Sequence, residues 1–538
     1  MVKITKKITL IIFSLLIQIL LGAQCDTLYI LQSTDIHGHI YPYDYLNEEE
    51  ASWGLAKIST IVNKYRKLHD HVILVDCGDM IQGTPLTDYY HQERSTEPEP
   101  MIQIMNAMKY DVFTVGNHDI EQGPEIYDKA RQESNFPWLS ANSTLPNGLT
   151  YFEPYTIIPA GDLKVGFLGL TTPGIPKWMD DSLFPNITWS CMINTSRYYF
   201  TKLKEKSDLI VGVFHAGFTD EAKDFGTGEP LENASGVVAD LIPGFDVIFG
   251  GHTHRTLPSE PVVIKDDSPL KINSGSRGRF IGIVEIRYQK INEKFTILSK
   301  KGWLELVAGY PPDQEILALA SKAHEATKVF IDSKITNCSG NLNTENARYV
   351  DNALLDMIQE IQLLNSGATI SFTSCFDTGV EIDSGNIKRK DIYQLYPYPN
   401  FLYTVKMSPE QIKMFLEYSS KFYVCKNNLI EADPEIPGYS LDIAEGIEYR
   451  IDPKADYGER VNISAPENFF KESYYKVALN SFRASGGGGY LKALGIDSLN
   501  VISRSKINIP EMITSYLREI TSIEPKPSNN WKILDCCE

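Results

Sequence analysis

The sequence predicts a layered α/β protein with more than one domain. Its 538 residues are 43% apolar and 22% charged, which is typical of folded proteins, and this length favours two or more domains. Five short apolar runs alternate with stretches of helical periodicity. Strands that are buried on both faces and separated by helices indicate sheets with some parallel pairing, covered by helices.

Residues 1–24 have the pattern of a signal peptide. Three lysines precede an apolar run, Ile8–Leu21, which is shorter than the roughly 20 residues that a membrane span needs. We expect cleavage near Gly22–Gln24 and an exported protein, periplasmic, at the cell surface or secreted, with no transmembrane helix after cleavage. A retained membrane anchor and lipid attachment at Cys25 are the alternatives.

The charge balance argues against a partner that is a nucleic-acid polymer. The chain has 51 Lys and Arg against 69 Asp and Glu, a formal net charge of −18, whereas polyanion binders normally carry a basic surplus. A small anionic substrate is compatible with this balance if a metal supplies positive charge. The eight cysteines are scattered without C-x-x-C spacing, and the sequence does not pair them.

Each of the five apolar runs in the first half of the chain ends in Asp, Asn or His beside Gly. The segments are "TLYILQSTDIHGH", "HVILVDCGD", "YDVFTVGNHD", "SDLIVGVFHAG" and "FDVIFGGHTH". Between them, Trp53–Leu68 and Met101–Lys109 carry apolar residues at helical spacing. Because ligands bind beyond the carboxyl ends of parallel strands, we expect the polar clusters to lie together at one edge.

These clusters predict a metal centre. Taken singly, each has a structural explanation, such as a helix N-cap for Asp79 or a packed imidazole for His215, but five clusters at one sheet edge are hard to explain by packing. The set combines imidazole, carboxylate and amide without thiolate, which favours Zn, Mn, Co or Fe over calcium. It also exceeds one coordination site, so we expect two divalent metal ions, a clamp for displacement at phosphorus. The candidate ligands are Asp35, His37, Asp79, Asn117, His215, His252 and His254.

The series D-x-H, G-D, G-N-H-[DE], H and G-H-x-H resembles the calcineurin-like metallophosphoesterases, and the chain from about Asp26 onward resembles the secreted 5′-nucleotidase superfamily. This resemblance implies an αββα arrangement for the first domain. It also implies two ligand sets that share Asp79 as a bridge. One set is Asp35, His37, Asp79 and His254, and the other is Asp79, Asn117, His215 and His252.

The resemblance further implies catalytic residues beside the ions. His118 would lie near the leaving-group oxygen and stabilise or protonate it, and Asp119 would hold His118. Asn117 would contact the substrate as well as an ion.

After Pro311-Pro312 the pattern changes. Gln314–Ile331 is amphipathic at helical period, so we expect a linker helix within residues 310–333, between a first domain at 25–309 and a second α/β nucleotide-binding domain at 334–538. Two segments of the second domain, "YQLYPYPNFLYTV" and "LNSFRASGGGGY", place aromatic residues beside prolines or glycines. Flat rings on such turns suit base stacking, although core packing and a plain flexible turn are the alternatives.

The segments "YPYPN", "SFRASGGGGY" and "NNW" resemble the periplasmic 2′,3′-cyclic-nucleotide 2′-phosphodiesterase/3′-nucleotidases. That resemblance implies that Tyr398 and Phe482 form the two sides of a base clamp. Typical 5′-nucleotidases have an arginine in a glycine-rich turn, which Ser371–Gly379 lacks, and an acidic residue where Gly488 stands. Both departures favour the cyclic-nucleotide branch.

We therefore expect a metal-dependent phosphoric ester hydrolase whose substrate is a nucleotide. It would open a 2′,3′-cyclic nucleotide to the 3′-nucleotide and then cleave this to nucleoside and phosphate. The alternatives are a 5′-nucleotidase or UDP-sugar hydrolase, and a non-enzymatic surface binding protein. Because the metal ligands and the base clamp lie on different domains, the resemblance also implies closure by domain rotation.

Overall fold

The computed structural model describes residues 25–221, 231–291 and 294–536, and the predicted signal peptide lies outside the described residues. The chain forms two compact units. The first extends to Pro176 and resumes over Asp181–Thr327, and the second comprises Lys177–Asp180 and the chain from Lys328 onward. In the three described ranges no helix combines the length and the apolar character that a bilayer span requires.

The first unit contains a seven-stranded sheet in the order β14-β17-β16-β1-β4-β5-β6. Neighbouring strands from β1 to β6 are parallel, whereas β16 runs antiparallel to β1, and β17 runs antiparallel to both β16 and β14. The bounds are β1 Cys25–Ser33, β4 Val72–Asp76, β5 Val112–Thr114, β6 Trp138–Leu139, β14 Val262–Ile264, β16 Phe280–Ile291 and β17 Lys294–Leu306.

A second sheet, of six strands, has the order β13-β15-β12-β11-β9-β8. Its four central strands are parallel, and its two edge strands, β8 and β13, are antiparallel to their neighbours. The bounds are β8 Tyr155–Ala160, β9 Leu163–Thr171, β11 Leu209–His215, β12 Val247–Phe249, β13 Thr256–Leu257 and β15 Leu270–Ser274.

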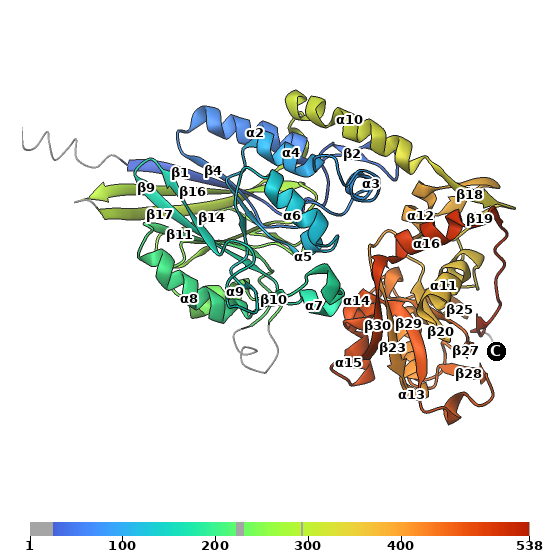
Figure 1. Ribbon diagram of the computed structural model, residues 1–538. Helices are drawn as coiled ribbons and strands as arrows, with labels where there is room; N and C mark the ends of the chain where they lie inside the picture. Colours follow the sequence, from blue (N-terminus) through green and yellow to red (C-terminus); the bar gives the residue numbers. More distant parts are fainter. Residues whose placement is uncertain (1–24, 222–230, 292–293, 537–538) are drawn as a thin grey trace, which may run out of the picture. The chain divides into compact units, whose positions relative to one another are not determined.

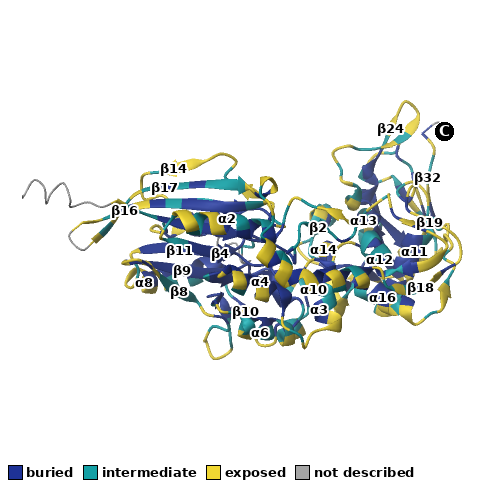
Figure 2. Cartoon of the chain, turned by 90° about the horizontal axis from the view of Figure 1, so that it is seen from above, coloured by how far each residue is buried: buried dark blue, intermediate teal, exposed yellow. Residues whose placement is uncertain are grey.

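The two sheets enclose the main core of the first unit. Ile30 and Val75 of the first sheet and Phe167 and Val213 of the second belong to one cluster of buried apolar side chains. The strands are apolar on both faces because each sheet packs against the other sheet on one face and against helices on the other. Figure 2 shows the strands of both sheets as largely buried.

Helices cover the outer faces of both sheets. Helices α2 (Leu55–Leu68) and α4 (Pro100–Met108) lie outside the first sheet, and α8 (Met192–Lys204) and α9 (Ser235–Leu241) lie outside the second (Figure 1). Residues of α8 and α9 share a second buried cluster with the outer face of the six-stranded sheet. The predicted layered αββα class is therefore confirmed.

The helices predicted from periodicity are present with small shifts at their ends. Helix α2 begins two residues after the predicted Trp53, and α4 begins at Pro100 instead of Met101. Proline at the first helical position suits a helix start, because its missing N–H would have no partner there. Helix α10 spans Gln314–Ile331, which is the predicted extent of the linker helix.

The second unit is built on a mixed five-stranded sheet in the order β26-β20-β29-β23-β30. Helices α11 (Ala353–Ser366) and α13 (Pro409–Ser419) pack against this sheet. The strands are β20 Ile370–Ser374, β23 Phe401–Met407, β26 Asp442–Glu445, β29 Tyr475–Asn480 and β30 Asn500–Asn508. A disulfide joins Cys425, in the hairpin of β24 (Tyr423–Lys426) and β25 (Leu429–Ala432), to Cys536.

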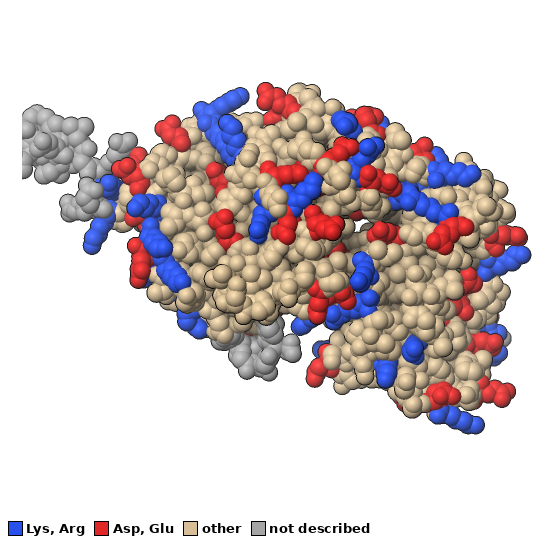
Figure 3. Space-filling view, viewed as in Figure 1, with Lys and Arg blue, Asp and Glu red and all other residues tan. Residues whose placement is uncertain are grey.

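Basic and acidic side chains are intermixed on the face drawn in Figure 3, and neither sign forms a continuous stripe there.

Candidate metal centre

The predicted metal ligands follow the carboxyl ends of strands in both sheets of the first unit. They are Asp35 and His37 after β1, Asp79 after β4, Asn117 after β5, His215 at the end of β11, and His252 and His254 after β12. Strands β1, β4 and β5 are parallel neighbours, and so are β11 and β12. Their carboxyl ends therefore meet at one edge of each sheet, where such folds bind ligands.

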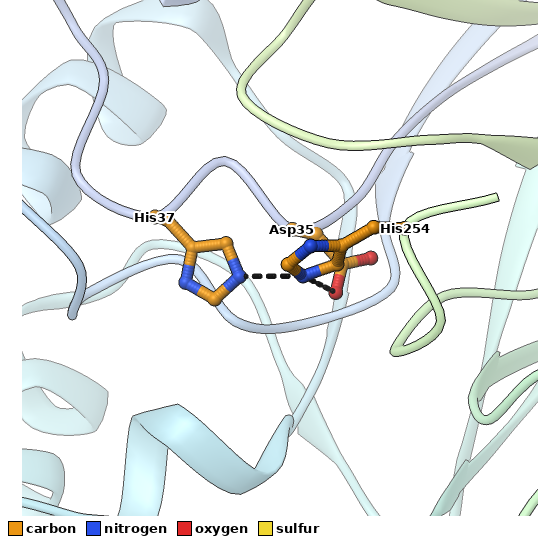
Figure 4. A group of neighbouring side chains, drawn as sticks. All are labelled: Asp35, His37 and His254. Carbon is orange, nitrogen blue, oxygen red and sulfur yellow. Dashed lines mark hydrogen bonds and ion pairs between the residues drawn. The ribbon is translucent and has the colours of Figure 1, made fainter. Parts of the chain in front are cut away.

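Asp35, His37 and His254 form one cluster (Figure 4). Nε2 of His37 lies 3.0 Å from Nε2 of His254, which lies 3.4 Å from Oδ1 of Asp35. One potential ligand atom of each residue lies within 4.8 Å of the others, close enough to share one ion. Asp35 is fully buried, whereas His254 is exposed, so the cluster opens to solvent on the side of His254.

Asp79, His215 and His252 form a second cluster, in which one potential ligand atom of each residue also lies within 4.8 Å of the others. Nε2 of His215 lies 3.2 Å from Oδ2 of Asp79 and 3.0 Å from Oδ1 of Asn117. The same Oδ2 of Asp79 lies 3.9 Å from Nε2 of His37, which belongs to the first cluster. The Asp79 carboxylate therefore lies between the two clusters, as a bridging ligand would.

Burial and neighbouring charges shift the pKa values of His37 and Asp79 toward the forms that bind a metal. Burial lowers the pKa of the His37 imidazole to about 3, which keeps its ring neutral, the form that binds a metal. Burial would raise the pKa of the Asp79 carboxyl, but nearby His215, His118 and His37 hold it well below its usual range. Burial would lower the pKa of His215, but the Asp79 carboxylate raises it to about 9, so this ring would release a proton on binding an ion. Imidazoles, carboxylates and an amide, without thiolate, are the donor set that zinc, manganese, cobalt and iron accept.

His118 lies beside this centre on the short helix α5 (Asn117–Ile120). Its backbone N–H donates to Oδ1 of Asp79 at 2.8 Å, and its ring Nδ1 lies 2.6 Å from Oε2 of Glu121. Burial would lower the pKa of His118, but the carboxylates of Glu121 and Asp79 raise it to about 10. The imidazole is therefore held in its protonated form, with a carboxylate partner that the sequence reasoning missed.

The prediction that Asp119 holds the His118 ring is wrong. The carboxylate of Asp119 instead accepts hydrogen bonds from four backbone N–H groups, those of Asp79 (2.8 Å), Met80 (2.9 Å), Ile81 (3.1 Å) and Gly116 (2.8 Å). The side chain of a residue next to His118 on a helix points away from it, whereas residues three apart share a face. The spacing of Glu121 in "HDIE" was the signal that could have identified the partner.

In the second unit, Tyr398 is 46% exposed. The ring of Phe376 lies edge-on to Tyr398 at 5.1 Å and to the buried Tyr396 at 4.8 Å, so the exposed ring rests on a partly buried aromatic neighbour. Phe376 belongs to the segment that lacks the arginine of typical 5′-nucleotidases.

Phe482 is 47% exposed and precedes the glycine run Gly486–Gly489 in the sequence. A Cβ on Gly487 would approach the Phe482 ring to 2.5 Å, so the ring lies directly on this glycine. A Cβ on Gly488 would meet Nη1 of Arg483 at 2.6 Å, and Nε of Arg483 donates to Asp442 at 2.6 Å. The space beside Gly488, where an acidic residue was expected in a 5′-nucleotidase, is therefore filled by a buried guanidinium. The use of Tyr398 and Phe482 as one base clamp stays a prediction.

Comparison with known proteins agrees with this architecture. Residues 28–256 match the family model of the calcineurin-like phosphoesterases, and residues 333–495 match that of the 5′-nucleotidase C-terminal domain. The solved structure of a 5′-nucleotidase precursor from Thermus thermophilus has a TM-score of 0.59 and 22% identity, and the match covers 94% of this chain and 99% of that one. That similarity reflects a shared fold.

Two curated relatives carry names that specify an activity. The chain is 26% identical, over 94% of its length, to the trifunctional nucleotide phosphoesterase protein YfkN of Bacillus subtilis, but it spans only 39% of that relative's length. It is 24% identical to a 2′,3′-cyclic-nucleotide 2′-phosphodiesterase/3′-nucleotidase of Haemophilus influenzae, over 94% of this chain and 87% of the relative. The chain thus belongs to the 5′-nucleotidase family, in which a calcineurin-like phosphoesterase domain precedes a 5′-nucleotidase C-terminal domain.

Proposed function

We propose that this protein hydrolyses nucleotide phosphoesters at a centre of two divalent metal ions. Membership of a metallophosphoesterase family implies such a dinuclear centre. The observation that carries the proposal is the position of the Asp79 carboxylate, which reaches His215 of one side-chain cluster at 3.2 Å and His37 of the other at 3.9 Å. When bound, a pair of ions would polarise the phosphoryl group, offset its charge and activate water.

The predicted ligands of the centre form two sets, one for each proposed ion. Asp35, His37 and His254 would hold one ion, and Asn117, His215 and His252 would hold the other, with Asp79 between them. Asn117 would also contact the phosphoryl oxygens through its amide. The ions themselves would be Zn, Mn, Co or Fe, because the donors suit each of these.

His118 would stabilise or protonate the leaving-group oxygen. With its pKa raised to about 10, the imidazole is protonated at neutral pH and can donate a hydrogen bond or a proton to the departing oxygen. Glu121 would orient the ring and keep the charge in place. Asp119 would act through the backbone, since its carboxylate fixes the loop that carries Asp79.

The substrate that we propose is a 2′,3′-cyclic nucleotide. Water would attack phosphorus, the bond to the 2′ oxygen would break, and that oxygen would take up a proton to give the 3′-nucleotide. A second hydrolysis would release nucleoside and phosphate. The missing arginine in Ser371–Gly379 and the filled space at Gly488 support this branch.

A second candidate is a 5′-nucleotidase or UDP-sugar hydrolase, which the fold shared with the Thermus thermophilus 5′-nucleotidase precursor supports. A non-enzymatic surface binding protein is the third. The complete set of seven predicted ligand positions favours an enzyme over a binding protein, because a chain without catalysis has no need to keep every metal ligand.

A three-substrate assay tests the proposal. Purified protein would be loaded with Mn²⁺, Co²⁺ or Zn²⁺ and supplied with 2′,3′-cAMP, 3′-AMP or 5′-AMP, and released phosphate and nucleoside would be measured. We expect turnover of the first two and little of the third. A clear preference for 5′-AMP would favour the second candidate, and no turnover of any nucleotide or of a chromogenic phosphodiester would favour the third.

We further propose that the protein is exported and acts on nucleotides outside the cytoplasm. The pattern of residues 1–24 and the disulfide between Cys425 and Cys536 support this location, because structural disulfides persist in oxidising compartments. Detection of the mature chain, without its first residues, in a periplasmic or extracellular fraction would test it.

A further inference from the structure

A carboxylate that the predicted ligand set does not include lies against His252. Oε1 of Glu232 is 3.0 Å from Nε2 of His252. Glu232 is separated from His252 by the whole of helix α9 and strand β12, so its approach is a product of the fold and not of local sequence. The His252 side chain is 13% exposed and that of Glu232 is 40% exposed. The contact therefore lies at the rim of the second side-chain cluster.

The two buried histidines of the centre have a comparable contact at one ring nitrogen. Nδ1 of His37 lies 3.0 Å from the carbonyl oxygen of Gln82, and Nδ1 of His215 lies 2.7 Å from that of Cys77. In both rings the other nitrogen, Nε2, faces the Asp79 carboxylate. A histidine that binds a metal usually donates its second ring N–H to a carbonyl or carboxylate, which fixes the tautomer and the ring orientation. His252 follows the same rule with Glu232 as its acceptor and with the two nitrogens exchanged.

The neighbour of Glu232 ties it to the loop that follows His215. Nδ2 of Asn233 lies 3.5 Å from Oε1 of Glu232, and Oδ1 of Asn233 accepts a hydrogen bond from the backbone N–H of Gly217 at 3.1 Å. The backbone N–H of Asn233 donates to Asp220 at 2.6 Å. The loops that carry His215 and Glu232 are therefore held together by hydrogen bonds, which fixes the carboxylate relative to the metal centre.

We propose that Glu232 is a positioning residue for the ion held by Asp79, Asn117, His215 and His252. Its carboxylate accepts a hydrogen bond from Nε2 of His252, which directs the other ring nitrogen of His252 toward the ion. A carboxylate acceptor also makes the ring a stronger donor than a carbonyl acceptor does, because it stabilises positive charge on the imidazole. This inference rests on the proposed two-ion function.

The test compares Glu232→Ala, Glu232→Gln and Glu260→Ala in the full-length protein. Glu260 is an exposed glutamate of the same unit, so its variant is the matched control. Each protein would be stripped of metal and titrated with Co²⁺, with bound metal measured by elemental analysis after equilibrium dialysis and the coordination followed by visible absorption. The melting temperature of each metal-free protein would show whether the fold is intact.

We expect Glu232→Ala to bind one of two Co²⁺ equivalents about 10- to 100-fold more weakly, with the other equivalent unchanged. Glu232→Gln should recover most of this loss, because its amide oxygen accepts the same hydrogen bond. The melting temperatures of the metal-free proteins should agree. Unchanged affinity for both equivalents in Glu232→Ala would overturn the inference and leave the proposed function intact.

If Glu232→Gln were as defective as Glu232→Ala, Glu232 would act as a direct ligand, and the positioning role would be wrong. If the unmodified protein bound fewer than two ions, the two-ion function itself would fail, which is a separate result.

Discussion

At the scale of single residues, most of the predicted metal ligands have an unusual backbone. Five of them lie in the left-handed region, which costs non-glycine residues roughly 1–3 kcal/mol each. Hydrogen bonds between adjacent loops hold this conformation. The backbone N–H of Asp35 donates to the carbonyl oxygen of Gly78 at 2.9 Å, and that of His37 donates to the carbonyl oxygen of Asp79 at 2.9 Å. The residues and their φ angles are Asp35 at 50°, His37 at 49°, Asp79 at 58°, His252 at 69° and His254 at 56°.

Replacement of Asp79 should disable the centre as a whole. In Asp79→Asn the shared ligand loses its charge, so we expect both ions to bind more weakly and kcat/KM to fall by more than the roughly 10- to 100-fold typical of groups outside the ligand shell. Elemental analysis and the nucleotide assay would measure this. Asp162→Asn, at an exposed aspartate of the same unit, is the control and should behave like the unmodified protein. Full metal content in Asp79→Asn would contradict the bridging role.

Replacement of His118 should depend on the leaving group. A ribose oxygen is a poor leaving group, so His118→Asn should lower kcat for nucleotides by about 10²- to 10⁴-fold. A nitrophenyl phosphodiester, whose leaving group needs no proton, should lose much less. Steady-state kinetics with both substrates would measure the difference.

Glu121→Gln and Asp119→Asn separate the two acidic neighbours of His118. Glu121→Gln should share the leaving-group dependence of His118→Asn, because it removes the partner of Nδ1. Asp119→Asn should weaken metal binding, because it disturbs the loop of Asp79. The opposite pattern would restore Asp119 as the partner of His118.

At the scale of elements, the end of the chain is attached to helix α11 through a group of acidic side chains. The backbone N–H of Ser528 donates to Asp356 at 2.7 Å, and its hydroxyl donates to Asp351 at 3.2 Å and to Glu445 at 2.9 Å. Burial, together with the charges of Asp351 and Glu445, raises the pKa of Asp356 to about 7. Folding therefore favours the protonated form of this carboxyl.

The sign of the pH effect follows from this shift. A carboxyl whose pKa is higher in the folded state stabilises the fold fully below its unfolded pKa, near 4, and this contribution is lost as pH rises through about 7. We expect Asp356→Asn, which carries no charge, to melt about 2–4 °C above the unmodified protein at pH 8, or about 1 kcal/mol after allowance for screening.

Thermal denaturation at two pH values would measure this difference, which should shrink at pH 5. Asp383→Asn, at an exposed position of the same unit, should show no difference at either pH. A lower melting temperature for Asp356→Asn at pH 8 would contradict the shift.

The elements that position the centre were largely predictable. Each strand before a predicted ligand is a short run of β-branched or aromatic residues, and Asp, Asn or His follows it closely in the sequence. The helix Gln314–Ile331 was also predictable, because Pro311-Pro312 marks a start and the apolar residues that follow have helical spacing, whereas its role as a linker stays a prediction.

What the sequence did not reveal are contacts between distant segments. The hydrogen bonds of Asp119 to the loop of Asp79 and the approach of Glu232 to His252 depend on how the loops fold on one another. The left-handed backbone of five predicted ligands gave no signal either, because glycine is the residue that normally indicates that conformation. The pairing of Cys425 with Cys536 was also not predictable from spacing, since scattered cysteines allow many combinations.

At the scale of the whole molecule, the two units carry different parts of the proposed chemistry. The first unit contains the metal ligands and His118, whereas the second contains the exposed rings of Tyr398 and Phe482. The proposed recognition of the base can therefore be tested by substitutions that leave the predicted metal ligands unchanged.

Phe482→Ala should affect only substrates that have a base. Loss of a stacking ring costs about 1–3 kcal/mol, so we expect KM for 2′,3′-cAMP to rise by about 5- to 150-fold, with kcat changed little. Hydrolysis of a nitrophenyl phosphodiester, which lacks a base, is the internal control and should be unaltered. An equal loss with both substrates would show that Phe482 supports the fold instead of the base.

The link between Cys425 and Cys536 bears on how the protein is handled. The predicted ligands of the metal centre contain no sulfur, so thiol reagents in purification buffers would give them no protection. The same reagents would reduce the disulfide, which joins two cysteines of the second unit that are 111 residues apart in the sequence. Preparations kept free of dithiothreitol, from a host that oxidises cysteines, are therefore expected to be the more heat-resistant ones.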